Sequence, residues 1–304
     1  MKKTTVFIIV LLLMITSIKS FAQNREAANE SVPIISATMS KLRSHESLKA
    51  NIRMDITLDG EEYATQGKYV EEEATITSGD DLSRSRFRLD LNFPLSSSES
   101  LGKGLNKMTV ICDKEIVWQY ISIENNTWLN KIDINKVLDA IKKSPKKSKF
   151  STVGGITGLG GLGGLVRSIR DNYVFTNEPV DFLLKGKTPL KVWKISGTMQ
   201  PDLRGRLETE LGKTKEQTIF PSHLPTDVEI YVGQDDDFPY RVHYYNTPDP
   251  NHPQTRTSIT QLVFFDVLIN DGTIPSYLFK SSFDQNNTSG QNDITDDFIK
   301  SLGL

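Results

Sequence analysis

Alternation of apolar and polar residues with a period of two is the feature that most constrains how this chain can fold. Residues 52–58 alternate in this way, and residues 86–93 repeat the pattern with phenylalanine and leucine at the apolar positions. Successive side chains of a β-strand point to opposite faces of a sheet, so each segment is predicted as a strand with one buried and one wet face. Strands covered on both faces would read as continuous apolar runs, so the pattern predicts antiparallel strands.

A β-hairpin is predicted over residues 108–123, because two apolar runs flank Asp113-Lys114, which is a candidate two-residue turn. Trp118 and Tyr120 lie two apart and are therefore expected on one face of the second strand. Further strands are predicted at residues 193–199, 228–232, 240–245 and 258–268, where apolar residues again share faces.

Three helices are predicted beside these strands. Residues 31–42 carry apolar residues at helical spacing, as do residues 134–141, and residues 162–169 suggest a third, short helix. The sequence predicts an α+β fold, a strongly bent antiparallel sheet with helices covering its concave side. No linker separates two cores, so residues 23–304 are predicted as a single domain with a helical, glycine-rich insertion at about residues 130–172.

The first 22 residues are typical of a signal peptide. Lys2 and Lys3 precede a short apolar run, and Ser20 and Ala22 stand where a signal peptidase requires small residues. We expect cleavage after Ala22 and a soluble periplasmic protein; the alternative is an uncleaved N-terminal anchor. The apolar run is too short to cross a bilayer comfortably.

Composition and cysteine content exclude several classes of protein. The chain is 37% hydrophobic and 24% charged with a net charge of −2, which indicates neither disorder nor a strongly basic nucleic-acid binder. Cys112 is the only cysteine, so an internal disulfide is impossible, and we expect it to be a small buried residue.

Motifs for catalysis or cofactor binding are weak. Residues 158–163 match GxGxxG by letter, but a lysine-rich segment precedes them where a dinucleotide site needs a strand. The carboxylates at residues 235–237 are expected in a solvated turn, and a metal site is the less favoured alternative. The four histidines are scattered, and neither HExxH nor GxSxG occurs. We therefore predict no catalytic residues, no metal and no cofactor, and no enzyme.

The segment from residue 142 to residue 169 combines five lysines, a glycine-leucine run and a short amphipathic helix. We predict that residues 153–169 form a lid that hinges on glycines, because glycine tolerates large backbone changes. Its apolar residues are Leu159, Leu162, Leu165, Val166 and Ile169. The lysines could meet anionic headgroups, and the alternative is a surface insertion without a role.

Three stretches resemble the LolA-like superfamily of outer-membrane lipoprotein-sorting and carrier proteins. They are Gly67-Lys68-Tyr69 with residues 84–90, the hairpin CDKEIVWQY at residues 112–120, and residues 224–245 with 263–280. The resemblance implies a half-open β-barrel with a helical lid around an apolar cavity that holds acyl chains. The chain departs from the family in its length, in its glycine-rich insertion and in Asp113-Lys114, where a turn glycine is usual.

From strand alternation and this resemblance, we predict a carrier that holds acyl chains of lipoproteins or lipids for envelope transport. It is expected to be a monomer that meets lipoprotein acyl chains or lipid, a membrane surface or envelope transport proteins, and no nucleic acid. A structural or sensory envelope protein with a side-chain-filled core is the alternative, and a secreted hydrolase a weaker one. The predicted cavity wall comprises Ile52, Met54, Ile56, Phe87, Leu89, Leu91, Trp118, Tyr120, Trp193, Ile195, Val228, Ile230, Val263 and Phe265.

Overall fold

A computed structural model describes most of the chain after residue 29. The described residues are 30–58, 61–75, 84–93, 106–123, 126–143, 161–185, 189–210, 224–247, 256–280 and 291–301. The predicted signal peptide and the predicted lid residues 153–160, including Leu159, lie outside these ranges. Among the described residues, no helix is both long and apolar enough to cross a membrane.

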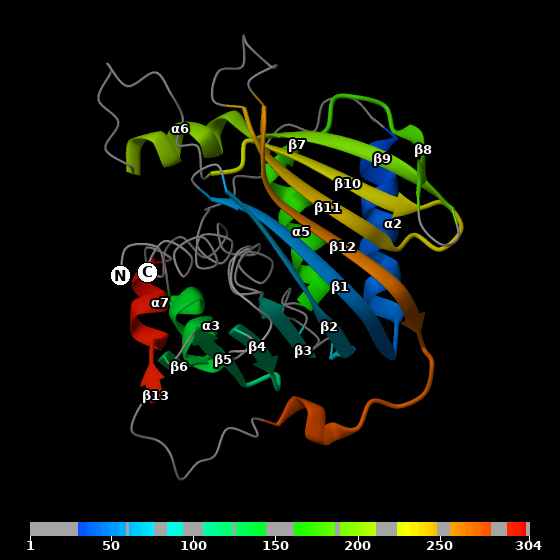
Figure 1. Ribbon diagram of the computed structural model, residues 1–304. Coiled ribbons are helices and arrows are strands. Elements are labelled where there is room, and N and C mark those ends of the chain that lie inside the picture. Colours follow the sequence, from blue (N-terminus) through cyan, green and yellow to red (C-terminus); the bar gives the residue numbers. More distant parts are fainter. Residues whose placement is uncertain are drawn as a thin grey trace.

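Thirteen strands form one large, curved sheet (Figure 1). Along the sheet the order is β13-β6-β5-β4-β3-β2-β1-β12-β11-β10-β9-β7, and β8 also pairs with β9. The strands are β1 (Ser47–Leu58), β2 (Glu61–Thr75), β3 (Arg84–Phe93), β4 (Asn106–Cys112), β5 (Ile116–Ile123), β6 (Asn126–Asp133), β7 (Tyr173–Val174), β8 (Val180–Leu184), β9 (Leu190–Met199), β10 (Asp227–Gly233), β11 (Pro239–Asn246), β12 (Thr257–Ile269) and β13 (Gln291–Asp293).

The sheet consists of two antiparallel meanders, as the alternation predicts. Strands β1 to β6 follow one another as neighbours, and β9 to β12 form the second run. The two runs join where β12 pairs with β1, so the last long strand lies beside the first. Among the described strands, β13 alone pairs in parallel, with β6.

Five α-helices and one 3-10 turn accompany the described part of the sheet. They are α2 (Ser31–Ser44), α3 (Ile134–Lys143), α5 (Gly161–Asn172), α6 (Pro201–Glu210), α7 (Thr295–Ser301) and η3 (Ser276–Phe279). Helices α2 and α5 contact each other and pass behind β12 and β1 in Figure 1. Helix α3 contacts β5 and α7.

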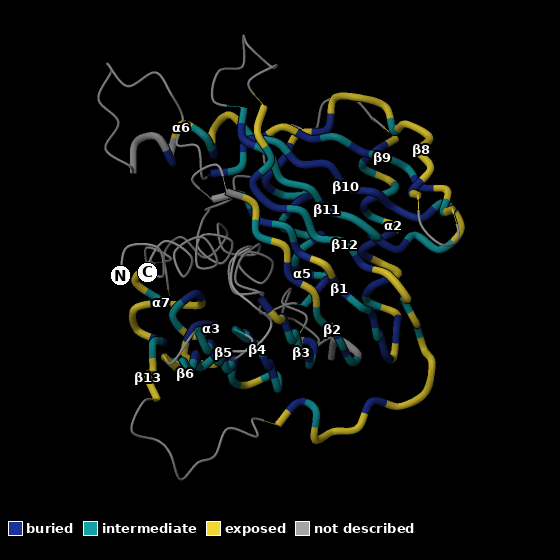
Figure 2. Tube along the Cα trace, in the orientation of Figure 1, coloured by how far each residue is buried: buried dark blue, intermediate teal, exposed yellow. Residues whose placement is uncertain are grey.

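The core forms where the apolar stripes of the helices meet one face of the sheet. In α2, Ile35, Met39 and Leu42 recur at helical spacing, and all three are buried. Figure 2 shows the buried residues along the central strands, whereas β8 and the segment after β12 are mostly exposed. Cys112 is buried in this core, as expected.

Two local expectations need correction. Strand β4 ends at Cys112 and β5 begins at Ile116, so three residues connect them instead of the two predicted at Asp113-Lys114. The Asp113 carboxylate accepts hydrogen bonds from the N–H groups of Glu115 and Ile116, at 3.0 and 2.7 Å, which stabilises the wider turn. Strands β6, β7, β8 and β13 were not expected from the sequence, because their residues lack a clear apolar alternation.

Candidate functional site

The buried face of the sheet is the first candidate site. Residues that pair directly across antiparallel strands point to the same side, so the register identifies the members of each face. Ten of the predicted wall residues share this buried face: Ile52, Met54, Ile56, Phe87, Leu89, Leu91, Trp193, Ile195, Val228 and Ile230. All ten belong to the main apolar cluster or pack against it.

The other four predicted wall residues lie on the opposite face. Trp118 pairs with Ile111, whereas Val117 pairs with Cys112 and through it with Phe87. Val263 pairs with Arg53, and Phe265 pairs with Asn51 and is exposed. Tyr120, two residues from Trp118, has the same orientation. These four residues therefore cannot share a wall with the other ten.

The physical reason is that both strands are apolar on each face. In β5, Val117 and Ile121 are apolar on one face and Trp118 and Tyr120 are aromatic on the other. In β12, the run Val263-Phe264-Phe265 contains no polar residue that would mark the solvent-facing side. In the structure Phe264 is the buried residue of that run.

Helix α5 packs over the buried face with the apolar residues that the sequence assigned to a lid. Leu162, Val166 and Ile169 are buried in the main cluster, and Leu165 packs against it. The helix contacts α2 and β3. Residues 161–169, the described part of the predicted lid, thus pack against the core.

A buried carboxylate accepts a hydrogen bond from the first turn of α5. Glu71 on β2 is 2% exposed, and its Oε2 accepts hydrogen bonds from the Tyr69 hydroxyl at 2.7 Å and from the Leu162 N–H at 3.2 Å. The Leu162 N–H also donates to the Tyr69 hydroxyl oxygen at 3.0 Å. The first N–H groups of a helix have no partner within the helix, so Glu71 and Tyr69 satisfy one of them and fix where α5 begins.

Gly161 permits this close approach. Its φ is +57°, and a Cβ at this position would lie 2.2 Å from Glu71 Oε1 and 2.7 Å from Ser85 Oγ. Only glycine combines the left-handed backbone with the missing side chain. We call Tyr69, Glu71, Gly161 and Leu162 the α5 anchor.

The environment of the anchor shifts the pKa of Glu71. Burial raises the pKa of Glu71, while buried His45 nearby and the hydrogen bonds act to lower it. Neither ring nitrogen of His45 has a hydrogen-bond partner among the described residues. Sequence reasoning missed both residues, because Glu71 stands in a run of three glutamates that looks like a solvated strand edge.

Replacing Glu71 with glutamine should remove a pH-dependent part of the stability. Because the pKa of Glu71 is raised in the folded state, its contribution is complete below its ordinary pKa of 4.5 and is lost as the pH rises through the folded value. The wild type should therefore lose stability relative to Glu71→Gln as the pH rises above 4.5. Urea unfolding at several pH values measures this. Exposed Glu62 on the same strand provides the control, because Glu62→Gln makes the same change of charge outside the anchor.

The turn at residues 235–237 does not gather metal ligands. Asp236 accepts hydrogen bonds from the Phe238 N–H and the Tyr240 hydroxyl, and Asp237 adopts a φ of 57°. Among the described residues, no group of three or more His, Cys, Asp or Glu side chains could hold a metal ion. Of the GxGxxG match, Gly161 and Gly163 lie in the first turn of α5, and the earlier residues lie outside the described ranges.

No protein-family model matches the chain, and no curated protein matches it. Solved structures do match over most of its length. LprF from Mycobacterium bovis is 10% identical, with a TM-score of 0.35 over 81% of this chain and 96% of that one. An outer-membrane lipoprotein-sorting protein domain from Vibrio parahaemolyticus is 11% identical, with a TM-score of 0.31 over 82% and 96%. A LolA superfamily protein from Nitrosomonas europaea is 10% identical, with a TM-score of 0.26 over 84% and 98%.

Proteins of the predicted family are thus among the solved structures to which this chain is similar. Every one of these TM-scores is below 0.5, and the identities are near 10%. Any inference about the cargo, partner or activity of this protein must therefore rest on its own residues.

Proposed function

We propose that the protein binds acyl chains of lipids or lipoproteins between the buried face and α5, and carries them through the periplasm. The observation that carries this proposal is the apolar face that extends along the sheet from β5 to β9. Each methylene that leaves water for such a surface contributes about 0.8 kcal/mol, so a long acyl chain can be held without a specific polar group. The role is one of binding, not of catalysis.

In this proposal the curved sheet is a half-open β-barrel, α2 and α5 cover its concave side, and α5 is the part that moves. Helix α5 follows the glycine-rich run, and the anchor at its first turn provides a polar contact that can break and reform. When α5 lifts, the apolar residues beneath it become available to an acyl chain. We further propose that the working form is an exported monomer that begins at Gln23, a single domain over residues 23–304.

A second candidate function is that of a structural or sensory envelope protein whose core is filled by its own side chains. The observation in its favour is the tight burial of the face, where Ile195, Val228 and Ile230 are completely buried. The two candidates differ in what an added side-chain volume on the buried face should do.

Replacing Leu89 with phenylalanine separates the two. Leu89 lies on the buried face and is only partly buried. If an acyl chain enters beside it, Leu89→Phe should abolish binding of a fluorescent fatty acid at little stability cost. In a filled core the added volume should instead cost about 1–3 kcal/mol. Val263→Phe adds an even larger volume on the opposite face and should leave fatty-acid binding unchanged.

Native mass spectrometry of the whole protein, purified without detergent, tests the proposal independently. Co-purifying lipid that is lost in Leu89→Phe and kept in Val263→Phe is the expected result. A clean protein mass together with no fatty-acid uptake would favour the filled core.

A further inference from the structure

A row of alternating apolar and cationic side chains crosses the opposite face of the sheet. The register pairs each member with the next, over strands β8, β9, β10, β11, β12 and β1. In order the members are Val180, Lys194, Tyr231, Arg241, Val263 and Arg53, which we call the cationic row. Neighbouring strands lie about 4.8 Å apart, so its cations recur at roughly 10 Å.

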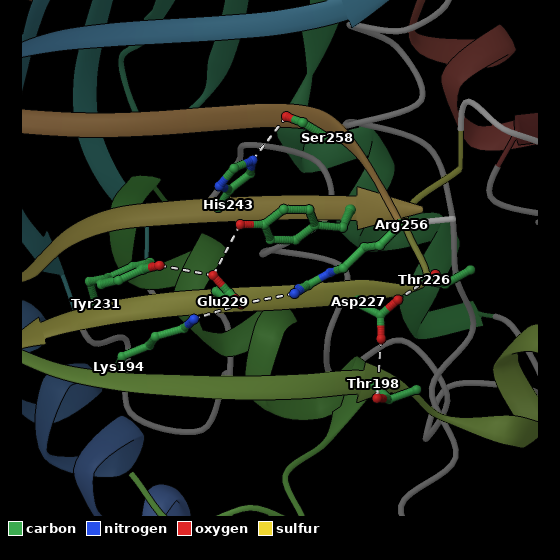
Figure 3. A network of polar contacts seen from close by, with 10 residues as sticks. Lys194, Thr198, Thr226, Asp227, Glu229, Tyr231, His243, Arg256 and Ser258 are labelled. Carbon is green, nitrogen blue, oxygen red and sulfur yellow. Dashed lines mark hydrogen bonds and ion pairs between the residues drawn. The ribbon is translucent and has the colours of Figure 1, made fainter. Parts of the chain in front are cut away.

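Two carboxylates near this row, Asp55 and Glu229, are less exposed than the cations that they contact. Asp55 is 26% exposed and accepts from Arg53 Nε at 2.9 Å, whereas Arg53 is 50% exposed. Glu229 has a side chain that is 4% exposed, compared with 29% for Lys194 and 32% for neighbouring Arg256. Its Oε1 accepts from Lys194 Nζ and from Arg256 Nη1, each at 3.0 Å (Figure 3). Its Oε2 accepts from the hydroxyls of Tyr231 and Tyr245 at 2.8 and 3.0 Å. Glu229 therefore holds Lys194 and Arg256 in place and balances one of their two positive charges.

Aromatic rings fix the guanidinium groups further. The Arg241 guanidinium lies 5.1 Å from the centre of the Tyr231 ring, and that of Arg256 lies 3.5 Å from the Tyr245 ring. Lysine and arginine carry several N–H donors each, so these side chains keep donors for an external anion. Because they are already ordered, binding loses little side-chain entropy.

The β8 end of the row is apolar and exposed. Val180 is 58% exposed, and Phe182, two residues along β8, is 40% exposed. Phe182 packs edge-on against Tyr231, with 5.3 Å between the ring centres, so the apolar end continues directly into the cationic part. Exposed apolar side chains beside fixed cations are typical of surfaces that lie in the interface of a bilayer.

We propose that this face docks onto an anionic lipid bilayer. Lys194, Arg241 and Arg53 meet the headgroup phosphates, while Val180 and Phe182 enter the boundary between headgroups and acyl chains. An acidic protein segment would satisfy the cations but would leave the apolar end exposed, so a bilayer fits the whole row better. Docking does not depend on acyl binding by the buried face, and it goes beyond the proposed carrier role.

Co-sedimentation of the full chain with vesicles tests the proposal. One set of vesicles contains phosphatidylcholine and phosphatidylglycerol in equal parts, and the other contains phosphatidylcholine alone. We expect binding to the anionic set only, weakened by salt because exposed charges are screened. The double variant Arg53→Gln, Arg241→Gln should bind roughly fivefold more weakly for each charge removed. Arg53→Lys with Arg241→Lys keeps the charge and should restore most of the binding.

The matched control removes two cations elsewhere. Lys136 lies on α3 and Lys300 on α7, and Lys136→Gln with Lys300→Gln makes the same change in net charge. Retained binding in this control and weakened binding in Phe182→Ser support docking through the cationic row. No binding to anionic vesicles, an equal loss in the control, or binding to polyglutamate in place of vesicles would overturn it. Fatty-acid uptake measured on the same variants reports separately on the proposed function, because the row lies on the other face.

Discussion

Replacing Glu229 with glutamine is expected to lower the free energy of unfolding by about 2–3 kcal/mol at neutral pH. Burial acts to raise the pKa of Glu229, but hydrogen bonds from Lys194, Tyr231 and Arg256 outweigh it and lower the pKa to about 2. A fall from 4.5 to about 2 is worth on the order of 3 kcal/mol, and glutamine keeps part of the hydrogen bonding. Urea unfolding of the two proteins measures the difference.

The pH dependence of this effect has the opposite sign to that of Glu71. A depressed pKa stabilises the folded state above the ordinary value of 4.5, and the contribution is lost as the pH falls towards 2. The difference between wild type and Glu229→Gln should therefore be constant near neutrality and shrink in acid. Asp235, exposed in the turn after β10, offers a control of equal charge change, and Asp235→Asn should stay within about 0.5 kcal/mol of wild type. An equal loss in both variants would show that net charge, and not the network, is responsible.

Replacing Gly161 with alanine is expected to cost about 2–3 kcal/mol and to displace the start of α5. The substitution forces alanine into a left-handed backbone, which costs about 1–2 kcal/mol, and drives its Cβ into the buried Glu71 carboxylate. Thermal unfolding measures the stability, and hydrogen exchange of the Leu162 amide reports directly on the anchor.

Gly163 supplies a control two residues away. Its added Cβ would meet only Leu42 Cβ at 3.9 Å, an ordinary contact, so Gly163→Ala should be neutral or stabilise the helix by up to about 1 kcal/mol. Similar losses in both variants would contradict the assignment of Gly161 to the anchor.

The main strands could be predicted from the sequence because one side of each is polar. In β1 and β3 charged residues mark the wet face, and the buried residues follow as expected. In β5 and β12 both faces are apolar, so alternation predicts a strand but not its orientation, and Trp118 and Phe265 were assigned to the wrong side. Register across neighbouring strands, which depends on long-range pairing, decides that question.

The polar features were hidden for a different reason. Glu71 and Glu229 both sit in strands, where a charged residue predicts a solvated position, yet both are buried because their partners come from elsewhere in the chain. Leu162 lies 91 residues from Glu71, and Arg256 lies 27 residues from Glu229. Local sequence patterns cannot predict such long-range contacts.

The most direct test of acyl binding beneath a movable α5 is to lock that helix in place. A Cβ at Gly163 would lie 3.9 Å from Leu42 Cβ on α2, within the range of about 3.5–4.5 Å that disulfides require, and the only native cysteine, Cys112, is buried. The double variant Leu42→Cys, Gly163→Cys should take up a fluorescent fatty acid when reduced and at least roughly tenfold more slowly when oxidised, because α5 cannot lift. Fast uptake in both states, or no uptake in either the reduced variant or the wild type, would contradict the account.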